Sequence, residues 1–205
     1  MITNFKPDIC LSLGENCLSA GILKSLNLKN ESYLFDWAAC EKFDILLDIL
    51  NNDLGHHIYN NINNNNVVNT MHNFQLGEGD RSKIIYLHHP EDKEYQIKVA
   101  QRFFDTINND SLKILFIYSY GMASLNISDD EFDNLIKIMI NKYPNLNFKI
   151  LILHYAGEYF GEDNYQFNLV RNTDIIYKYD FYTKTRPPWP MDQLHEYEIF
   201  KFLFF

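Results

Sequence analysis

A cysteine stands directly after the first apolar segment of the chain, where a strand gives way to a helix. Apolar residues alternate from Ile9 to Leu13, Gly14 permits a tight turn, and apolar residues recur at helical spacing from position 18. We therefore expect Cys17 in the first turn of that helix, where the partial positive charge lowers the pKa of a thiol and makes it a better nucleophile. The alternative is that Cys17 is a small buried apolar residue, as most unpaired cysteines are.

The same turn offers hydrogen-bond donors for a developing negative charge. The backbone amides between Gly14 and Cys17, with the side chain of Asn16, predict a site for the oxyanion of an acyl-transfer reaction. One such donor contributes about 3 kcal/mol to the stability of the transition state. A thiol and an oxyanion site still require a base, which must come from elsewhere in the chain.

Other candidates for the chemistry are an aspartate and several histidines. Asp36 lies between large aromatic residues in the segment 33–37, and two interpretations are open: an exposed turn residue and a functional carboxylate. The chain has seven histidines. His72 lies in an alternating segment, where a half-buried structural histidine is equally typical. His154, which follows a strong strand, is its main rival as the base, and His195 is a more distant one.

The spacing of histidines and cysteines does not favour a metal site. His56–His57 and His88–His89 are adjacent pairs, and neighbouring side chains in a strand point to opposite faces. No spacing typical of zinc ligands occurs, so we expect no metal. The chain also lacks the GxSxG, P-loop and GxGxxG patterns. Three cysteines without a CxxC pair are too few for a disulfide scaffold.

Composition excludes several classes of partner. The 205 residues are 46% hydrophobic and show no shift in composition, which indicates a single domain over residues 1–205. A net charge of −9 without a dense basic run argues against nucleic acid. No apolar run approaches the ~20 residues of a membrane helix, and the first residues lack the features of a secretory leader. We expect a cytoplasmic protein without a membrane partner, and a homo-oligomer remains an open alternative.

The second half of the chain gives the clearest indication of the fold. Segments 113–118 and 148–153 are nearly continuous apolar runs, typical of strands covered on both faces, and a capped helix from Ser128 lies between them. This order indicates a parallel pair. Further helices are expected over 40–52, 92–108 and 191–205, and further strands over 84–87 and 174–179. We therefore expect an α/β three-layer sandwich with a mainly parallel central sheet.

A parallel sheet brings the candidate residues to one edge. Ligands bind beyond the carboxyl ends of the strands in such sheets. Cys17 follows the first strand, and the segments 118–121 and 154–157 each follow their own strand. We expect the functional cleft where these segments meet.

Blocks of the first half of the sequence resemble a known family. The blocks are Ser-Leu-Gly-x-x-Cys at 12–17, Phe-Asp-Trp at 35–37 and His-Asn-Phe at 72–74. They are similar to a bacterial and viral family of uncharacterised proteins named "putative papain-like cysteine peptidases". The resemblance extends to about Arg102 and rests on the combination of the blocks.

The resemblance implies roles for individual residues. Cys17 is the implied nucleophile, His72 the base and Asp36 the residue that orients the imidazole. Asn73 stands where the family has Asp, and Leu34 stands where it has Pro. An asparagine accepts a hydrogen bond but does not stabilise an imidazolium as a carboxylate does. Gly14, Asn16, Trp37 and Asn73 are the implied residues for binding the oxyanion and the substrate.

The placement of the cysteine after the first strand is also similar to esterase-type hydrolases and to a coenzyme-A-binding family implicated in capsule acetylation. The latter similarity rests on Asn16, Cys17 and the expected fold. We expect a cysteine-dependent acyl-transfer enzyme, a peptidase-like hydrolase or an acyltransferase, with a small-molecule or peptide acyl substrate. No cofactor is expected, except coenzyme A if it carries the acyl group. The alternatives are a non-catalytic module that binds a nucleotide, coenzyme or sugar, and a scaffold that uses its aromatic C-terminal end.

Overall fold

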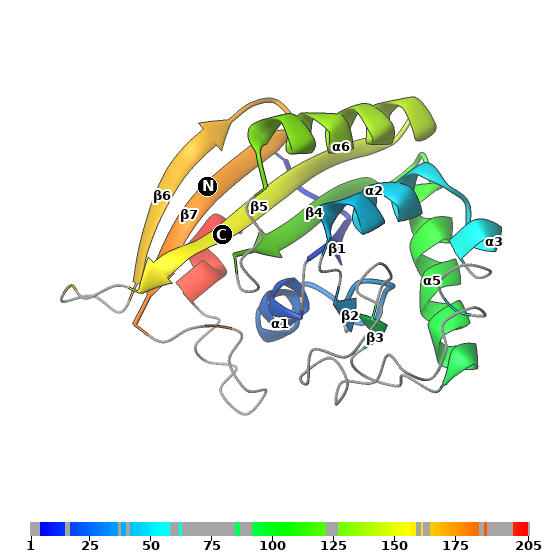
Figure 1. The fold of residues 1–205 in the computed structure, drawn as a ribbon, viewed down its shortest axis with the longest axis horizontal. Helices are drawn as coiled ribbons and strands as arrows, with labels where there is room; N and C mark the ends of the chain where they lie inside the picture. The colour runs from blue at the N-terminus through cyan, green and yellow to red at the C-terminus, as the bar shows by residue number, and fades with distance from the viewer. Residues whose placement is uncertain are drawn as a thin grey trace.

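A five-stranded sheet is the centre of the fold (Figure 1). The computed structural model describes residues 5–14, 17–36, 38–39, 42–57, 62, 85–86, 92–121, 127–158, 161, 165–184, 187 and 199–204. The strand order is β1-β4-β5-β7-β6, in which all pairs are parallel except the antiparallel pair β6 and β7. The bounds are β1 Ile9–Ser12, β4 Lys113–Tyr120, β5 Asn147–Glu158, β6 Tyr165–Asn172 and β7 Ile176–Thr183. The prediction of a mainly parallel central sheet is confirmed.

Helices cover both faces of this sheet (Figure 1). On one face, α1 (Leu18–Ser25) packs its Leu18 and Ile22 against Leu115 and Leu151 of the sheet. The other face carries α2 (Phe43–Asn51), α5 (Lys93–Ile107) and α6 (Asp129–Lys142). The predicted three-layer sandwich is therefore confirmed. The remaining elements are α3 (Leu54–His57) and the antiparallel pair of β2 (Ala38–Ala39) and β3 (Ile85–Tyr86).

Side chains in the sequence fix the starts of two helices. The carboxylate of Asp92 accepts from the amide of Tyr95 at 2.9 Å, and α5 begins at Lys93, directly after Asp92. Ser128 and Glu131 form a reciprocal capping box at the start of α6. That helix ends before Pro144, which cannot continue it. These contacts confirm the predicted helix starts.

The sheet is larger than the sequence predicts. β4 continues to Tyr120 and β5 to Glu158, so residues 118–120 and 154–157 lie within these strands, and the expectation that they follow them is wrong. Beyond Tyr155, β5 continues by pairing with β7 alone, through a register shift next to Gly157. β6 has no counterpart in the sequence analysis because it is an edge strand with mostly exposed side chains and no continuous apolar run. The predicted strand at 84–87 pairs with β2, outside the main sheet.

The aromatic C-terminal segment packs into the core. Residues 199–203 form a short 3₁₀ segment on the same face as α1, and the side chains of Phe200 and Leu203 are fully buried there. Phe200 contacts the rings of Phe167 and Phe181 edge-on. This burial favours a structural role for Phe200 and Leu203 over a partner-binding tail. In the described ranges, we find no helix with the length and apolarity that a membrane crossing needs.

Candidate active site

Cys17 lies between the end of β1 and the start of α1. It occupies the N-cap position, one residue before the helix, and its carbonyl oxygen accepts the amide of Gly21 at 2.8 Å. The helix therefore begins one residue later than the prediction requires, and Cys17 directly precedes its first turn. The Cys17 side chain is half-buried, whereas Cys10 is only 3% exposed in the core. Of these two thiols, only that of Cys17 is accessible to a substrate.

The thiol of Cys17 is kept in its protonated form by its surroundings. Burial raises its pKa, and a hydrogen bond from the backbone of Cys17 only partly offsets this effect. The pKa is thus raised, opposite to the direction expected from the helix end, because desolvation by burial is the larger cause. Burial also raises the pKa of Cys10, to about 12. A reaction at Cys17 needs a base that removes the proton.

Buried hydroxyl groups connect the start of α1 to the sheet. The hydroxyl of Ser19, in the first turn of α1, lies 2.8 Å from that of Ser119 near the end of β4, and both residues are fully buried. The amide of Gly14 lies 3.5 Å from the hydroxyl of Ser12, a long contact that leaves this donor only weakly engaged. The contact between Ser19 and Ser119 was not predicted from the sequence. The available signal was the position of Ser119 at the end of a buried strand.

Asp36 lies in the turn formed by residues 33–36 and is fully buried. Its Oδ2 accepts from the amide of Tyr33 at 2.6 Å and forms an ion pair with the ammonium group of Lys29. Its Oδ1 has no hydrogen-bond donor among the residues that the structure describes. Burial raises the pKa of Asp36, and Lys29 opposes this shift. The turn is as expected, but the exposed position considered for Asp36 is wrong.

The other predicted site residues lie outside the described part of the chain. These residues are Asn16, Trp37, His72 and Asn73. Of the predicted set, the structure thus describes Gly14, Cys17 and Asp36. The assignment of His72 as the base, and of Asp36 as the residue that orients it, stays a prediction.

His154, the alternative candidate for the base, forms a pair with Asp180 on the neighbouring strand β7. His154 Nδ1 on β5 lies 2.9 Å from Asp180 Oδ1 on β7. The His154 ring stacks on that of Tyr120, the last residue of β4. Tyr120 belongs to the face that α6 covers, so His154 and α1 lie on opposite faces of the sheet.

Comparison with known proteins bears on the first third of the chain. Residues 8–72 match the model of the family described as "Putative papain-like cysteine peptidase". The matched segment contains Cys17, Asp36 and His72, and it ends well before His154. No curated protein and no solved structure matches the chain. The suspected resemblance is therefore confirmed for this segment.

Metal binding finds no support in the described residues. No group of three or more His, Cys, Asp or Glu side chains lies close enough together there to hold an ion. The expectation of a site without metal stays a prediction.

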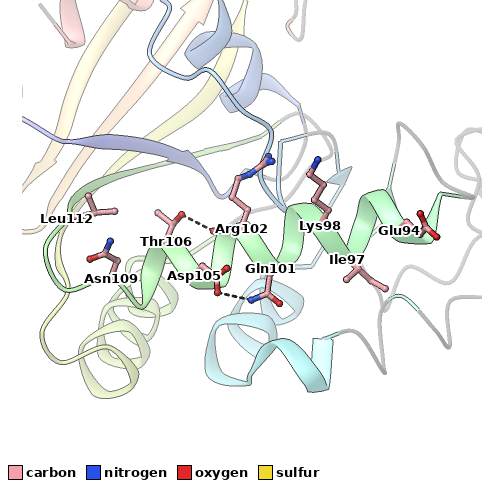
Figure 2. Close-up of a pocket in the computed structure, with 9 residues that line it drawn as sticks. All are labelled: Glu94, Ile97, Lys98, Gln101, Arg102, Asp105, Thr106, Asn109 and Leu112. Atoms are coloured by element: carbon pink, nitrogen blue, oxygen red, sulfur yellow. Dashed lines mark hydrogen bonds between the residues drawn. The ribbon is translucent and has the colours of Figure 1, made fainter.

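A shallow groove runs along α5 (Figure 2). It continues to Leu112, next to the amino end of β4, and so lies away from the carboxyl ends of the strands. The Arg102 side chain in this groove is held by the carbonyl of Ser32 at 2.5 Å and by Glu31. The lining residues include no cysteine or histidine; they are Glu94, Ile97, Lys98, Gln101, Arg102, Asp105, Thr106, Asn109 and Leu112. Cys17, which follows the carboxyl end of β1, remains the better candidate for the reactive residue.

Proposed function

We propose that the protein is a cysteine hydrolase in which Cys17 attacks the carbonyl carbon of an acyl substrate. The observation that carries this proposal is the half-buried thiol between β1 and α1, within a segment matched to a cysteine-peptidase family. Its position follows the rule that ligands bind at the carboxyl ends of parallel strands. The substrate class is an ester, thioester or amide of a small molecule or peptide.

A base is essential because burial keeps the thiol protonated. In the proposed reaction, His72 takes the proton of Cys17 as the sulfur attacks, and gives it to the leaving group as the tetrahedral intermediate collapses. Asp36 accepts the other N–H of the imidazole and stabilises its charged form. The Asp36 Oδ1 atom, buried and without a described donor, is the acceptor we assign to this bond.

The oxyanion is assigned to donors at the turn before α1. Helical hydrogen bonds begin with the amide of Gly21, so the amides of Ser19 and Ala20 have no acceptor inside the helix itself. Together with the weakly engaged amide of Gly14 and the side chain of Asn16, they supply donors where negative charge develops. Trp37 and Asn73 are assigned to contacts with the acyl group. No step requires coenzyme A or another cofactor.

The nucleophile is tested with p-nitrophenyl acetate, an activated ester that reports acylation by release of p-nitrophenolate. In the unaltered protein we expect an initial burst and an acetyl group on Cys17. In the Cys17→Ser variant we expect both to be lost. The matched control is Cys10→Ala, which removes the buried thiol and should retain the burst. Mass spectrometry of peptides identifies the modified residue.

Two outcomes separate this proposal from a binding module. If Cys17→Ser and Cys17→Ala give the same burst as the unaltered chain, Cys17 is not the nucleophile. If the unaltered chain forms no acetyl adduct, the protein does not use this thiol for acyl transfer. A non-catalytic nucleotide, coenzyme or sugar module would then be the better description of the same edge.

A further inference from the structure

The two edges of the central sheet differ in their exposure to solvent. β1 forms one edge, and three of its four residues are buried. β6 forms the other edge, where β7 is its only partner among the described strands and six of its eight residues are exposed. Figure 1 shows β6 as the outermost strand of the sheet. Half of the backbone amide and carbonyl groups of such a strand point away from the sheet, where they can pair with a further strand.

β6 lacks most of the features that protect an edge strand from pairing. Proteins protect their edges with short strands, prolines, lysines or bulges. β6 extends over eight residues and contains no proline, lysine or acidic residue. Its one charged side chain, Arg171, is bonded at 2.6 Å to Asp133 of α6 in the same chain. A register shift next to Val170 interrupts the pairing with β7, so residues 165–169 are the regular part of the strand that a partner can extend.

An apolar strip lies along one face of this regular part. Tyr165, Phe167 and Leu169 alternate along β6 and therefore point to the same face, where Phe167 packs edge-on against the buried Phe200. The ring of Phe167 also contacts those of Tyr165 and Phe202, with centroids 5.7 Å and 4.9 Å apart. Tyr165, Leu169 and Phe202 are 40%, 50% and 42% exposed. The core of this face thus continues to the edge of the sheet and ends in apolar side chains that are open to solvent.

The residue pattern of β6 is complementary to itself. A twofold axis that passes through Phe167 perpendicular to the sheet pairs two copies of β6 antiparallel and keeps equivalent faces on the same side. In this register Tyr165 lies opposite Leu169 of the second copy, and Phe167 lies opposite its own equivalent. On the other face Gln166 lies opposite Asn168 of the second copy; within one chain these two amides bond to each other at 3.1 Å. Apolar side chains therefore meet apolar side chains, and amides meet amides.

The distribution of charge favours a second copy as the partner at this edge. With a net charge of −9, two copies of the chain repel each other on average. Residues 165–169 carry no charge, so two copies can meet here without like charges opposite each other. A strongly acidic or basic partner would find no opposite charge along the same segment. The edge is therefore better suited to itself than to a partner recognised by charge.

We propose that the chain forms a symmetric dimer in which β6 pairs antiparallel with β6 of a second copy. The two five-stranded sheets then form one continuous sheet, and the apolar strips of the two copies lie side by side. Cys17 follows β1, at the opposite end of the strand order, so the dimer leaves the candidate active site accessible. This dimer does not depend on the hydrolase activity proposed above.

Sedimentation equilibrium over a range of protein concentrations tests this dimer. We expect the unaltered chain to shift, as its concentration rises, from the mass of one chain of 24.4 kDa to that of two. Tyr165→Lys/Leu169→Lys places like charges opposite each other at two symmetric positions, so the dissociation constant should rise by about 10-fold or more. Tyr165→Glu/Leu169→Lys places opposite charges there and should dimerise more tightly than the like-charged variant. This order of affinities is specific to the register centred on Phe167.

The matched control is Ile140→Lys, which adds the same charge at an exposed apolar residue of α6 and should leave the dissociation constant unchanged. Hydrogen exchange of the unaltered chain needs no variant, and the amides of residues 165–169 should exchange more slowly at high than at low protein concentration. If the unaltered chain stays monomeric, the proposal is overturned and the edge is left for an extended segment of another protein. If both double variants dimerise as tightly as the unaltered chain, the copies associate through another surface, and the proposal is overturned as well.

Discussion

Two of the acid–base pairs among the described residues, Lys29–Asp36 and His154–Asp180, lie in contrasting surroundings. Lys29 and Asp36 are almost completely buried, with side-chain exposures of 6% and 0%, whereas His154 and Asp180 keep about a quarter or more of their side chains exposed. Asp36 Oδ2 accepts the amide of Tyr33, so the buried pair is tied to the turn of residues 33–36, and Asp36 Oδ1 is the atom assigned to His72. The His154–Asp180 pair is partly open to solvent. The difference in burial therefore predicts that the first pair contributes more to stability than the second.

The largest effect on stability is expected from breaking the buried pair. Lys29→Met leaves the Asp36 carboxylate without its cation, and removal of one partner of a buried ion pair costs about 3 to 5 kcal/mol. Urea unfolding at neutral pH measures this loss in the free energy of unfolding. The control is Lys98→Met, at an exposed lysine on α5, which should change this free energy by less than about 0.5 kcal/mol. A small effect of Lys29→Met would mean that the pair does not organise the turn.

The pH dependence of stability sharpens the same contrast. Burial raises the pKa of Asp36 above its ordinary value of 3.8, despite Lys29. Between these two values the folded state holds a proton that the unfolded chain has lost, so the associated stability is complete below 3.8 and is lost as the pH rises through the folded value. We expect the free energy of unfolding to fall relative to that of Asp36→Asn as the pH rises from about 4. Urea titrations at several pH values measure the difference, and a constant difference would contradict the raised pKa.

The parts of the structure that the sequence predicts well are those that depend on local patterns. The apolar runs at 113–118 and 148–153 identify the two central strands because both faces of these strands are covered. The capping residues Asp92 and Ser128 locate helix starts because their bonds reach only three residues along the chain. The position of Cys17 between a strand and a helix is predicted for a similar reason, since these elements are contiguous in the sequence, whereas its role stays a prediction.

The parts that escape prediction depend on contacts across the fold. The Ser19–Ser119 bond joins residues one hundred positions apart, and the His154–Asp180 pair exists only because β7 is parallel to β5 in one particular register. The state of the Cys17 thiol is of the same kind. The sequence shows the helix that would lower its pKa, but the burial that raises it arises only in the folded chain.

An intermediate effect is expected for the buried hydroxyl pair. Ser19→Ala or Ser119→Ala alone leaves one buried hydroxyl without its partner, which costs about 1 to 3 kcal/mol. The double variant removes both groups, so its loss of stability should be smaller than the sum of the two single losses. Urea unfolding of the three variants gives the coupling energy. Simple additivity would show that the two hydroxyls do not depend on each other.

The smallest effect on stability is expected at the His154–Asp180 pair. Asp180→Asn removes the charge opposite His154 but retains the shape of the side chain, and partly exposed pairs contribute only about 0 to 1 kcal/mol. The free energy of unfolding of this variant should therefore lie within about 1 kcal/mol of the unaltered value. A loss comparable to that of Lys29→Met would show that both pairs serve the fold. The contrast between the two pairs would then fail, because a partly exposed pair would contribute as much to stability as a buried one.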